Sequence, residues 1–247
     1  MSLRLVSVNI ERSKHLDLVC SFLENENADV VCVQELCERD IPTIRRAAGE
    51  HVIFTPFAVH PADTSDTSDP VVGVGIFSRH PFVHTEIVYY RGSEDAARTE
   101  SARETFTNHA LVVADIRSDE ATTRIVTTHF TWTPDGSASQ LQRVNAVAMF
   151  ERLAGMGEFV LCGDFNAPRG GEVWAMITDH FKDNIPTKYA SSIDASLHRA
   201  GKLRPQELAD KMVDGVFSTS GYEVSNVELH TGISDHCAIT ATISKSE

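Results

Sequence analysis

The chain has 247 residues, of which 42% are hydrophobic and 23% are charged, and its formal net charge at pH 7 is −13. This balance is typical of a globular protein, and no apolar run approaches the roughly 20 residues that a membrane-spanning helix needs. An acidic surface repels polyanions, which argues against tight nonspecific binding to duplex DNA, although bound metal ions can still bring positive charge to a phosphate.

The cysteine content and the N-terminal sequence indicate a reducing compartment. The cysteines are odd in number, the spacing of Cys32 and Cys37 is not that of a zinc finger, and Cys32 and Cys162 lie inside apolar runs. The N-terminal stretch MSLRLVSVNI has no long apolar core or cleavage site and is typical of a strand rather than a signal peptide. We expect a cytoplasmic, monomeric protein with one domain, residues 1–247.

The first elements predict a β-α-β unit. Residues 3–10 alternate and are rich in Val and Ile, which favours a strand. Leu16, Val19, Cys20 and Leu23 then fall on one face of a helix for which Ser13 is the expected N-cap. Residues 29–35 form a nearly continuous apolar strand, so the two strands are expected to run parallel.

The middle of the chain predicts an antiparallel section. A short helix is expected over residues 41–48, followed by a strand over 51–59 and an exposed flexible loop over 61–70, where the sequence is PADTSDTSDP. Residues 71–78, 82–90 and 106–116 then have strand character without a helix among them.

A second β-α-β unit follows. Residues 123–130 and 158–166 have strand character, and residues 137–155 between them predict the longest helix. Either Ser137 or Ser139 caps this helix, and Leu141, Val144 and Ala148 are expected on its buried face. A helix and loops are expected after residue 172, and residues 213–218, 222–229 and 237–243 predict closing strands.

Polar residues stand where the predicted strands end. Asn9, Glu35 and His129 each end a strand, and Asp164 ends another two residues before Asn166. Ligands of open α/β sheets bind at the carboxyl ends of strands. Asp235 and His236 precede the final strand, which must run antiparallel for them to meet the others. Taken singly, each residue also fits an ordinary role, such as an Asx-turn or a hydrogen-bonded core histidine. Their ordered combination favours a shared site.

The segments that carry these residues resemble motifs of the endonuclease/exonuclease/phosphatase superfamily of metal-dependent phosphoesterases. They are VSVNI, VVCVQE, GVGIFSR, VTTHF, CGDFNAP, VDGVFST and SDHCAI, in the order of that family and over nearly the whole chain. The resemblance implies an α/β (α+β) fold, a four-layer sandwich of two mixed sheets packed face to face with helices outside.

Carboxylate and amide oxygens favour Mg²⁺ or Mn²⁺ over zinc. The resemblance implies one principal ion on Glu35, with help from Asn9 and Asp235, and leaves open a second ion near Asp164 and Asn166. It also implies that the metal offsets phosphate charge and stabilises the leaving oxygen.

The resemblance further implies the catalytic roles. Asp164 orients or deprotonates the attacking water, and Asn166 donates a hydrogen bond to the phosphate. His236 is either the base or, when protonated, a donor to a non-bridging oxygen, and Asp214 holds its imidazole. His129 matches a histidine that many members direct at the phosphate or the leaving group.

The sequence does not identify the substrate. Arg103 and Trp132 are candidate substrate-binding residues, each with an ordinary surface or core role as the alternative. The leading interpretation is a phosphodiesterase or nuclease that hydrolyses a P–O bond by metal-assisted attack of water. The alternatives are a phosphomonoesterase, a lipid or inositol-phosphate phosphatase, a sphingomyelinase-like hydrolase, and an inactive phosphate-binding module.

Overall fold

The computed structural model describes residues 2–60, 70–99, 108–119, 121–201 and 203–246. Within these ranges the strands form two mixed six-stranded sheets, as expected. The first sheet has the order β11-β12-β1-β2-β4-β3. Its strands are β1 (Ser2–Asn9), β2 (Val30–Cys37), β3 (His51–Val59), β4 (Val71–Ser78), β11 (Tyr222–His230) and β12 (Ala238–Lys245).

The second sheet has the order β5-β6-β7-β8-β10-β9. Its strands are β5 (Phe82–Arg91), β6 (His109–Ser118), β7 (Ala121–His129), β8 (Val160–Asp164), β9 (Lys182–Asp183) and β10 (Asp214–Ser218). The predicted strand over 106–116 begins outside the described residues, as do residues 61–69 of the predicted loop.

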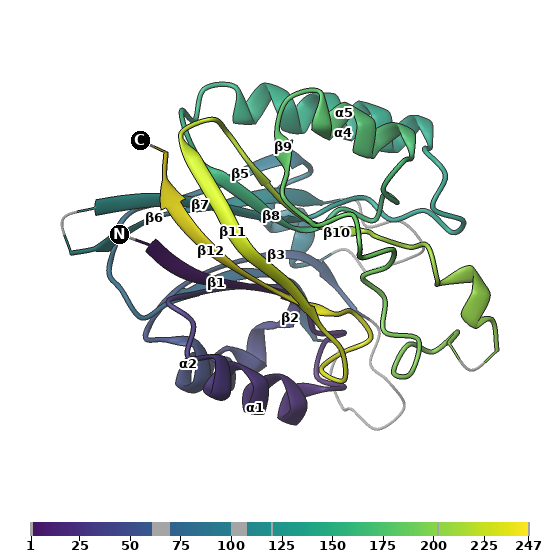
Figure 1. Ribbon diagram of the computed structural model, residues 1–247, viewed down its shortest axis with the longest axis horizontal. Helices are drawn as coiled ribbons and strands as arrows, with labels where there is room; N and C mark the ends of the chain where they lie inside the picture. The colour runs from purple at the N-terminus through teal and green to yellow at the C-terminus, as the bar shows by residue number, and fades with distance from the viewer. Residues whose placement is uncertain (1, 61–69, 100–107, 120, 202, 247) are drawn as a thin grey trace.

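Helices cover the outer faces of the two sheets. Helices α1 (Leu16–Glu26) and α2 (Ile41–Ala48) lie on the first sheet, and α4 (Gln140–Leu153) and α5 (Glu172–Thr178) lie on the second (Figure 1). The short elements are η1 (Glu38–Asp40), α3 (Glu94–Ala97) and η2 (Pro205–Glu207). Among the described helices, none has the length and apolar character needed to cross a bilayer. All five cysteines are free thiols, and four of them are buried.

Both predicted β-α-β units are confirmed. Strand β1 pairs parallel with β2 across α1, and β7 pairs parallel with β8 across α4. The pairs β3–β4, β5–β6 and β6–β7 are antiparallel, and β12 runs antiparallel to β1 as expected. Asn9, His129 and Asp164 end β1, β7 and β8 as predicted, whereas Glu35 does not end its strand, because β2 continues to Cys37.

The alternation of side chains along β1 determines what faces the space between the sheets. Leu3 and Leu5 belong to the cluster that contains side chains of the second sheet, whereas Val6 and Val8 pack under α1 and α2. Successive strand residues point to opposite faces. Asn9 has the same parity as Leu3 and Leu5, so its side chain enters the edge of the sandwich.

The predicted N-cap of α1 is wrong. The N-cap position is His15, which makes no side-chain capping hydrogen bond, and Ser13 Oγ instead donates to Asp40 Oδ2 at 2.5 Å. The chain adopts left-handed backbone at Glu11 and Arg12, with φ of 46° and 64°. This turn delays the start of the helix and moves Ser13 away from its first N–H groups.

The predicted buried face of α4 is also wrong, although Ser139 does cap the helix by accepting from Gln142 N at 3.1 Å. Val144 is 48% exposed, and Leu141 and Ala148 are only partly buried. The buried side chains of the helix are Gln142, Asn145, Ala146, Met149 and Leu153. Two polar residues face inward because, as described below, each finds a hydrogen-bond partner there.

Candidate active site between the two sheets

Strand register places three candidate residues in one row of the second sheet. His129 at the end of β7 is paired with Asp164 at the end of β8, and Asp164 is paired with Asp214 at the start of β10. Gly163 allows the close approach of β7 and β8, because a Cβ atom there would lie 2.1 Å from Thr128 O. The three side chains are buried at one edge of the sheet.

A β-bulge in β2 brings Glu35 to the same place. The register against β4 shifts between Val33 and Leu36, and Glu35 has a left-handed φ of 53°. Without the bulge, Glu35 would follow Val31 and Val33 towards α1 and α2. Such a conformation costs free energy in a non-glycine residue and is found mainly at functional positions.

Asn9 connects the two sheets at this edge. Its Nδ2 donates to Asp164 Oδ2 at 3.0 Å and to Glu35 Oε1 at 3.3 Å. Its Oδ1 accepts from the main-chain N–H of Glu11 at 3.1 Å. One buried amide therefore fixes carboxylates that come from different sheets.

His129 and Asn166 surround Asp164. His129 Nε2 lies 3.5 Å from Asp164 Oδ2, and the ring stacks on Phe57 with centroids 4.9 Å apart. Burial tends to lower the pKa of His129, but the carboxylate of Asp164 outweighs it and raises the pKa. Asn166, with a left-handed φ of 49°, donates its main-chain N–H to Asp164 Oδ1 at 2.8 Å and its Nδ2 to Phe130 O at 2.9 Å.

His236 and Asp214 form a buried pair across the sheets. His236 Nδ1 lies 2.7 Å from Asp214 Oδ2, while His236 Nε2 lies 3.9 Å from Asp164 Oδ2. Burial opposes protonation of His236, but the carboxylates of Asp214 and Asp164 raise its pKa well above the usual range. Burial likewise opposes ionisation of Asp164, yet the charges of His236 and His129 lower its pKa to about 2.

Asp235 completes an acidic group that fits a divalent cation. Burial raises the pKa of Asp235 to about 7; His236 opposes the shift, and the charges of Glu11 and Glu35 add to it. Burial and the neighbouring carboxylates together outweigh the charge of His236, and oxygen ligands of this kind suit Mg²⁺ or Mn²⁺. A buried group of Asp164, Asp214 and His236 also has ligand atoms within 4.8 Å of one another. In that group, the hydrogen bond between His236 and Asp214 already explains why these ligand atoms lie close together.

The inward polar face of α4 supports the loops that carry His129 and Asn166. Gln142 Nε2 donates to Thr131 O at 2.6 Å and to Asn166 O at 3.2 Å. Asn145 Nδ2 donates to Thr131 Oγ1 at 2.7 Å. These bonds join the chain after β7 to the chain after β8, so the helix holds both loops in one arrangement.

Five of the candidate residues line a cleft of about 1580 Å³: Glu35, Asp164, Asn166, Asp235 and His236. The structure brings together eight of the ten predicted residues: Asn9, Glu35, His129, Asp164, Asn166, Asp214, Asp235 and His236. Trp132 lines the cleft and is partly exposed, whereas Arg103 lies outside the described residues.

Sequence reasoning missed several residues at the site. Glu11 and His198 both line the cleft, and Phe57 packs on His129. The spacing of Gln142 and Asn145 on one helix face was an available signal for the support from α4. Nothing in the local sequence of Glu11 or His198 distinguishes them from surface residues.

The chain was compared with known proteins. Residues 6–236 match the model of the Endonuclease/Exonuclease/phosphatase family. No match was found among curated proteins. An endonuclease/exonuclease/phosphatase structure from Bacteroides vulgatus is 17% identical with a TM-score of 0.73, and the match covers 100% of both chains.

Two further solved structures have named activities or ligands. A mannosyl-6-phosphatase from Bacteroides thetaiotaomicron is 10% identical with a TM-score of 0.68, and the match covers 99% of this chain and 100% of that one. The human Nocturnin catalytic domain with a bound sulfate anion is 13% identical with a TM-score of 0.68, covering 99% and 94%. At these identities the likeness shows the fold alone.

Proposed function

Because the chain belongs to the endonuclease/exonuclease/phosphatase family, we propose that it is a phosphoesterase that requires Mg²⁺ or Mn²⁺ and hydrolyses a phosphodiester. The main support is that one cleft contains both the acidic side chains of Glu35 and Asp235 and the buried, positively charged His236. Hydrolysis at phosphorus needs charge stabilisation and alignment more than covalent catalysis by the protein.

Glu35 and Asp235, with the amide oxygen of Asn9, would hold the principal cation. Asp164 and Asn166 are the residues available to a second one. A bound divalent ion would offset charge on the phosphate and on the leaving oxygen. The raised pKa of Asp235 supports this assignment, because a cation would offset both the burial and the charges of Glu11 and Glu35 that cause it.

The remaining groups would align water and phosphate. Asp164 stays ionised because its pKa is about 2, so it can accept a hydrogen bond from the attacking water and orient it. His236, protonated and held by Asp214, donates to a non-bridging oxygen. Asn166 Nδ2 donates to Phe130 O and lies 3.4 Å from His129 Nε2, and its second N–H would serve the phosphate.

Two synthetic substrates test the proposal: bis-p-nitrophenyl phosphate and p-nitrophenyl phosphate, each with Mg²⁺, Mn²⁺ or excess EDTA. We expect metal-dependent cleavage of the diester, and loss of activity by at least about 100-fold in Glu35→Gln. The matched control is Glu24→Gln, an exposed carboxylate on α1, which should keep full activity.

Each other outcome contradicts a specific part of the proposal. Preference for the monoester would identify a phosphomonoesterase, the class to which the Bacteroides thetaiotaomicron protein belongs by its name. Full activity after chelation would exclude the metal mechanism. If neither substrate is cleaved while calorimetry still detects phosphate binding, the protein is a binding module.

A further inference from the structure

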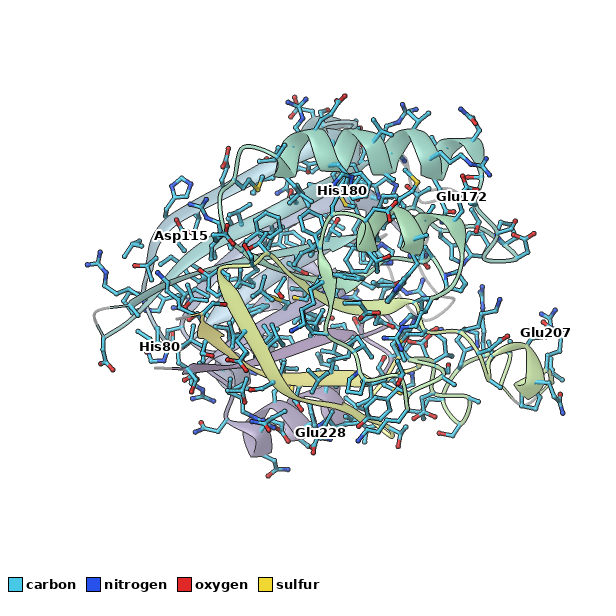
Figure 2. All side chains as sticks on the ribbon, turned by 45° about the horizontal axis from the view of Figure 1, so that its top comes forward. His80, Asp115, Glu172, His180, Glu207 and Glu228 are labelled. Atoms are coloured by element: carbon cyan, nitrogen blue, oxygen red, sulfur yellow. The ribbon has the colours of Figure 1, made fainter. Side chains whose placement is uncertain are left out.

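One wall of the cleft comes from residues 193–201 and 203–211, a largely irregular part of the chain that precedes β10. It projects from the body of the molecule on the side away from the termini (Figure 1), and Glu207 lies at its outer end (Figure 2). Its base is fixed to the loop that precedes β12: Ile193 forms a β-bridge with His236, and Asp194 N donates to Asp235 O at 2.9 Å. Asp194 Oδ2 accepts from Gly232 N at 2.6 Å. The segment therefore has a defined position beside the reacting groups.

His198 on this wall presents an N–H donor. Its Nδ1 accepts a hydrogen bond from the main-chain N–H of Ala200 at 3.1 Å. A ring nitrogen that accepts carries no proton, so the proton of the neutral imidazole is on Nε2. Burial, and then the charge of His236, lower the pKa of His198, which keeps the ring neutral. Its N–H is therefore available to an acceptor in the cleft.

Arg12 and Arg199 bring positive charge to the same cleft without a carboxylate partner among the described residues. Arg12 Nη1 contacts the ring of His60 at 2.8 Å, but its buried Nε has no hydrogen-bond partner in the described part of the chain. A buried guanidinium N–H without an acceptor is costly. This orphaned donor is therefore open to an acceptor that the described residues do not supply.

Other cations of the cleft are already engaged. Arg204 Nη1 lies 3.2 Å from Glu207, and Lys14 pairs with Glu11. Lys211 donates to the main-chain oxygen of Asp135 at 3.5 Å. Among the described arginines that line the cleft, Arg12 and Arg199 thus have no carboxylate partner, in a protein whose net charge is −13.

We propose that Arg12, His198 and Arg199 form a second anion-binding subsite, which holds a phosphate group of the substrate other than the one that reacts. This inference rests on the proposed function and deepens it, because it predicts a substrate with two phosphate groups. Two guanidinium groups and a neutral imidazole N–H are suitable donors for phosphate oxygens.

A matched pair of chromogenic diesters tests the subsite: thymidine 5′-(p-nitrophenyl phosphate) and its 3′-phosphorylated form. Both release p-nitrophenolate from the same bond and differ only in the additional phosphate. We expect the KM of the 3′-phosphorylated form to be lower by about tenfold or more, the effect of gaining one charge-assisted hydrogen bond. Equal KM values for the two substrates would overturn the subsite.

Variants identify the residues responsible. Arg199→Ala and Arg12→Gln should each reduce the KM advantage of the second phosphate by about tenfold, with little change for bis-p-nitrophenyl phosphate. Arg204→Ala is the matched control, since it removes the same charge from the same segment but from an existing ion pair. An equal effect of Arg204→Ala would mean that general cleft charge, and not the subsite, is responsible.

Calorimetry separates failure of the subsite from failure of the proposed function. Even if the protein hydrolyses neither diester, thymidine 3′,5′-bisphosphate should still bind more tightly than thymidine 5′-monophosphate. Arg199→Ala should remove this difference in affinity. Metal-dependent turnover without this difference would refute the subsite alone. The subsite would also be refuted if the Arg199→Ala variant kept the same difference in affinity between the two nucleotides.

Discussion

His236 Nδ1 lies 2.7 Å from Asp214 Oδ2, although Asp214 begins a strand of one sheet and His236 precedes a strand of the other. Asp214 stabilises the protonated imidazole and raises its pKa, and Asp164 adds to this effect. The pair therefore keeps a positive charge on His236 at pH values where a free imidazole is neutral.

Asp214→Asn should lower the pKa of His236, because it removes a negative charge from its nearest partner. The protonated fraction then decreases as pH rises, so activity should fall by about 100-fold at about pH 8 and much less at about pH 5. The pH dependence of kcat/KM on bis-p-nitrophenyl phosphate measures this. If activity of the variant instead increases with pH, His236 acts as a base.

Asp235→Asn should stabilise the metal-free protein at high pH. The folded protein binds the Asp235 proton with a pKa of about 7, compared with the ordinary 3.8, so stability is lost as pH rises from the lower value to the higher one. Asparagine cannot ionise, and Tm in EDTA at about pH 8 should rise by a few degrees while Tm at low pH changes little.

The same melting experiment tests the cation site. Mg²⁺ should raise the Tm of the natural protein, because a ligand that binds only the folded state stabilises it. Asp235→Asn should abolish this increase. An unchanged response to Mg²⁺ in the variant would place the cation elsewhere.

Gln142→Leu should impair catalysis from outside the reacting centre. The change leaves Thr131 O and Asn166 O without their donor, at a cost of about 1 to 3 kcal/mol for each buried carbonyl. We expect kcat to fall more than KM rises, since the loops of His129 and Asn166 lose their support. Val144→Ala, on the exposed face of the same helix, is the control for both activity and thermal unfolding.

Gly163→Ala should separate β7 from β8. The added Cβ would lie 2.1 Å from Thr128 O at a φ of 143°, so the cost should exceed about 2 kcal/mol. Gly157→Ala is the matched control, because its φ of 71° is also left-handed but no atom lies within 4 Å of the added carbon. Urea denaturation of both variants measures the difference; equal losses would show that backbone strain alone is responsible.

The sequence was sufficient to predict the β-α-β units and the edge of the sheets at which Asn9 and Asp164 lie. Both residues stand at the carboxyl end of a hydrophobic run with strand character. The direction of the Glu35 side chain could not be predicted from the sequence, because it depends on a bulge in which this glutamate adopts left-handed backbone. Such a conformation is set by the pairing of β2 with β4, and its local sequence gives no sign of it.

The orientation of α4 and the roles of Glu11 and His198 could not be predicted for a related reason. Apolar periodicity pointed to Val144, but Gln142 and Asn145 are buried because carbonyl and hydroxyl partners from distant loops are present. His198 reaches the cleft through an irregular segment, and hydrophobic patterning contains no information about the path of such a segment.

The division of the site between the sheets has a consequence for how the protein loses activity. Asn9 and Glu35 belong to the first sheet, and Asp235 and His236 belong to the loop that leads into its strand β12; His129, Asp164 and Asp214 belong to the second sheet, and Asn166 belongs to the loop that follows β8. Neither half of the sandwich contains both the acidic group and the histidine–aspartate pair. Any opening that slides the sheets apart separates Asn9 from Asp164 and His236 from Asp214 together. Turnover is therefore a direct measure of whether the sheets are docked, and inactivation should coincide with their separation even where each sheet keeps its own hydrogen bonds.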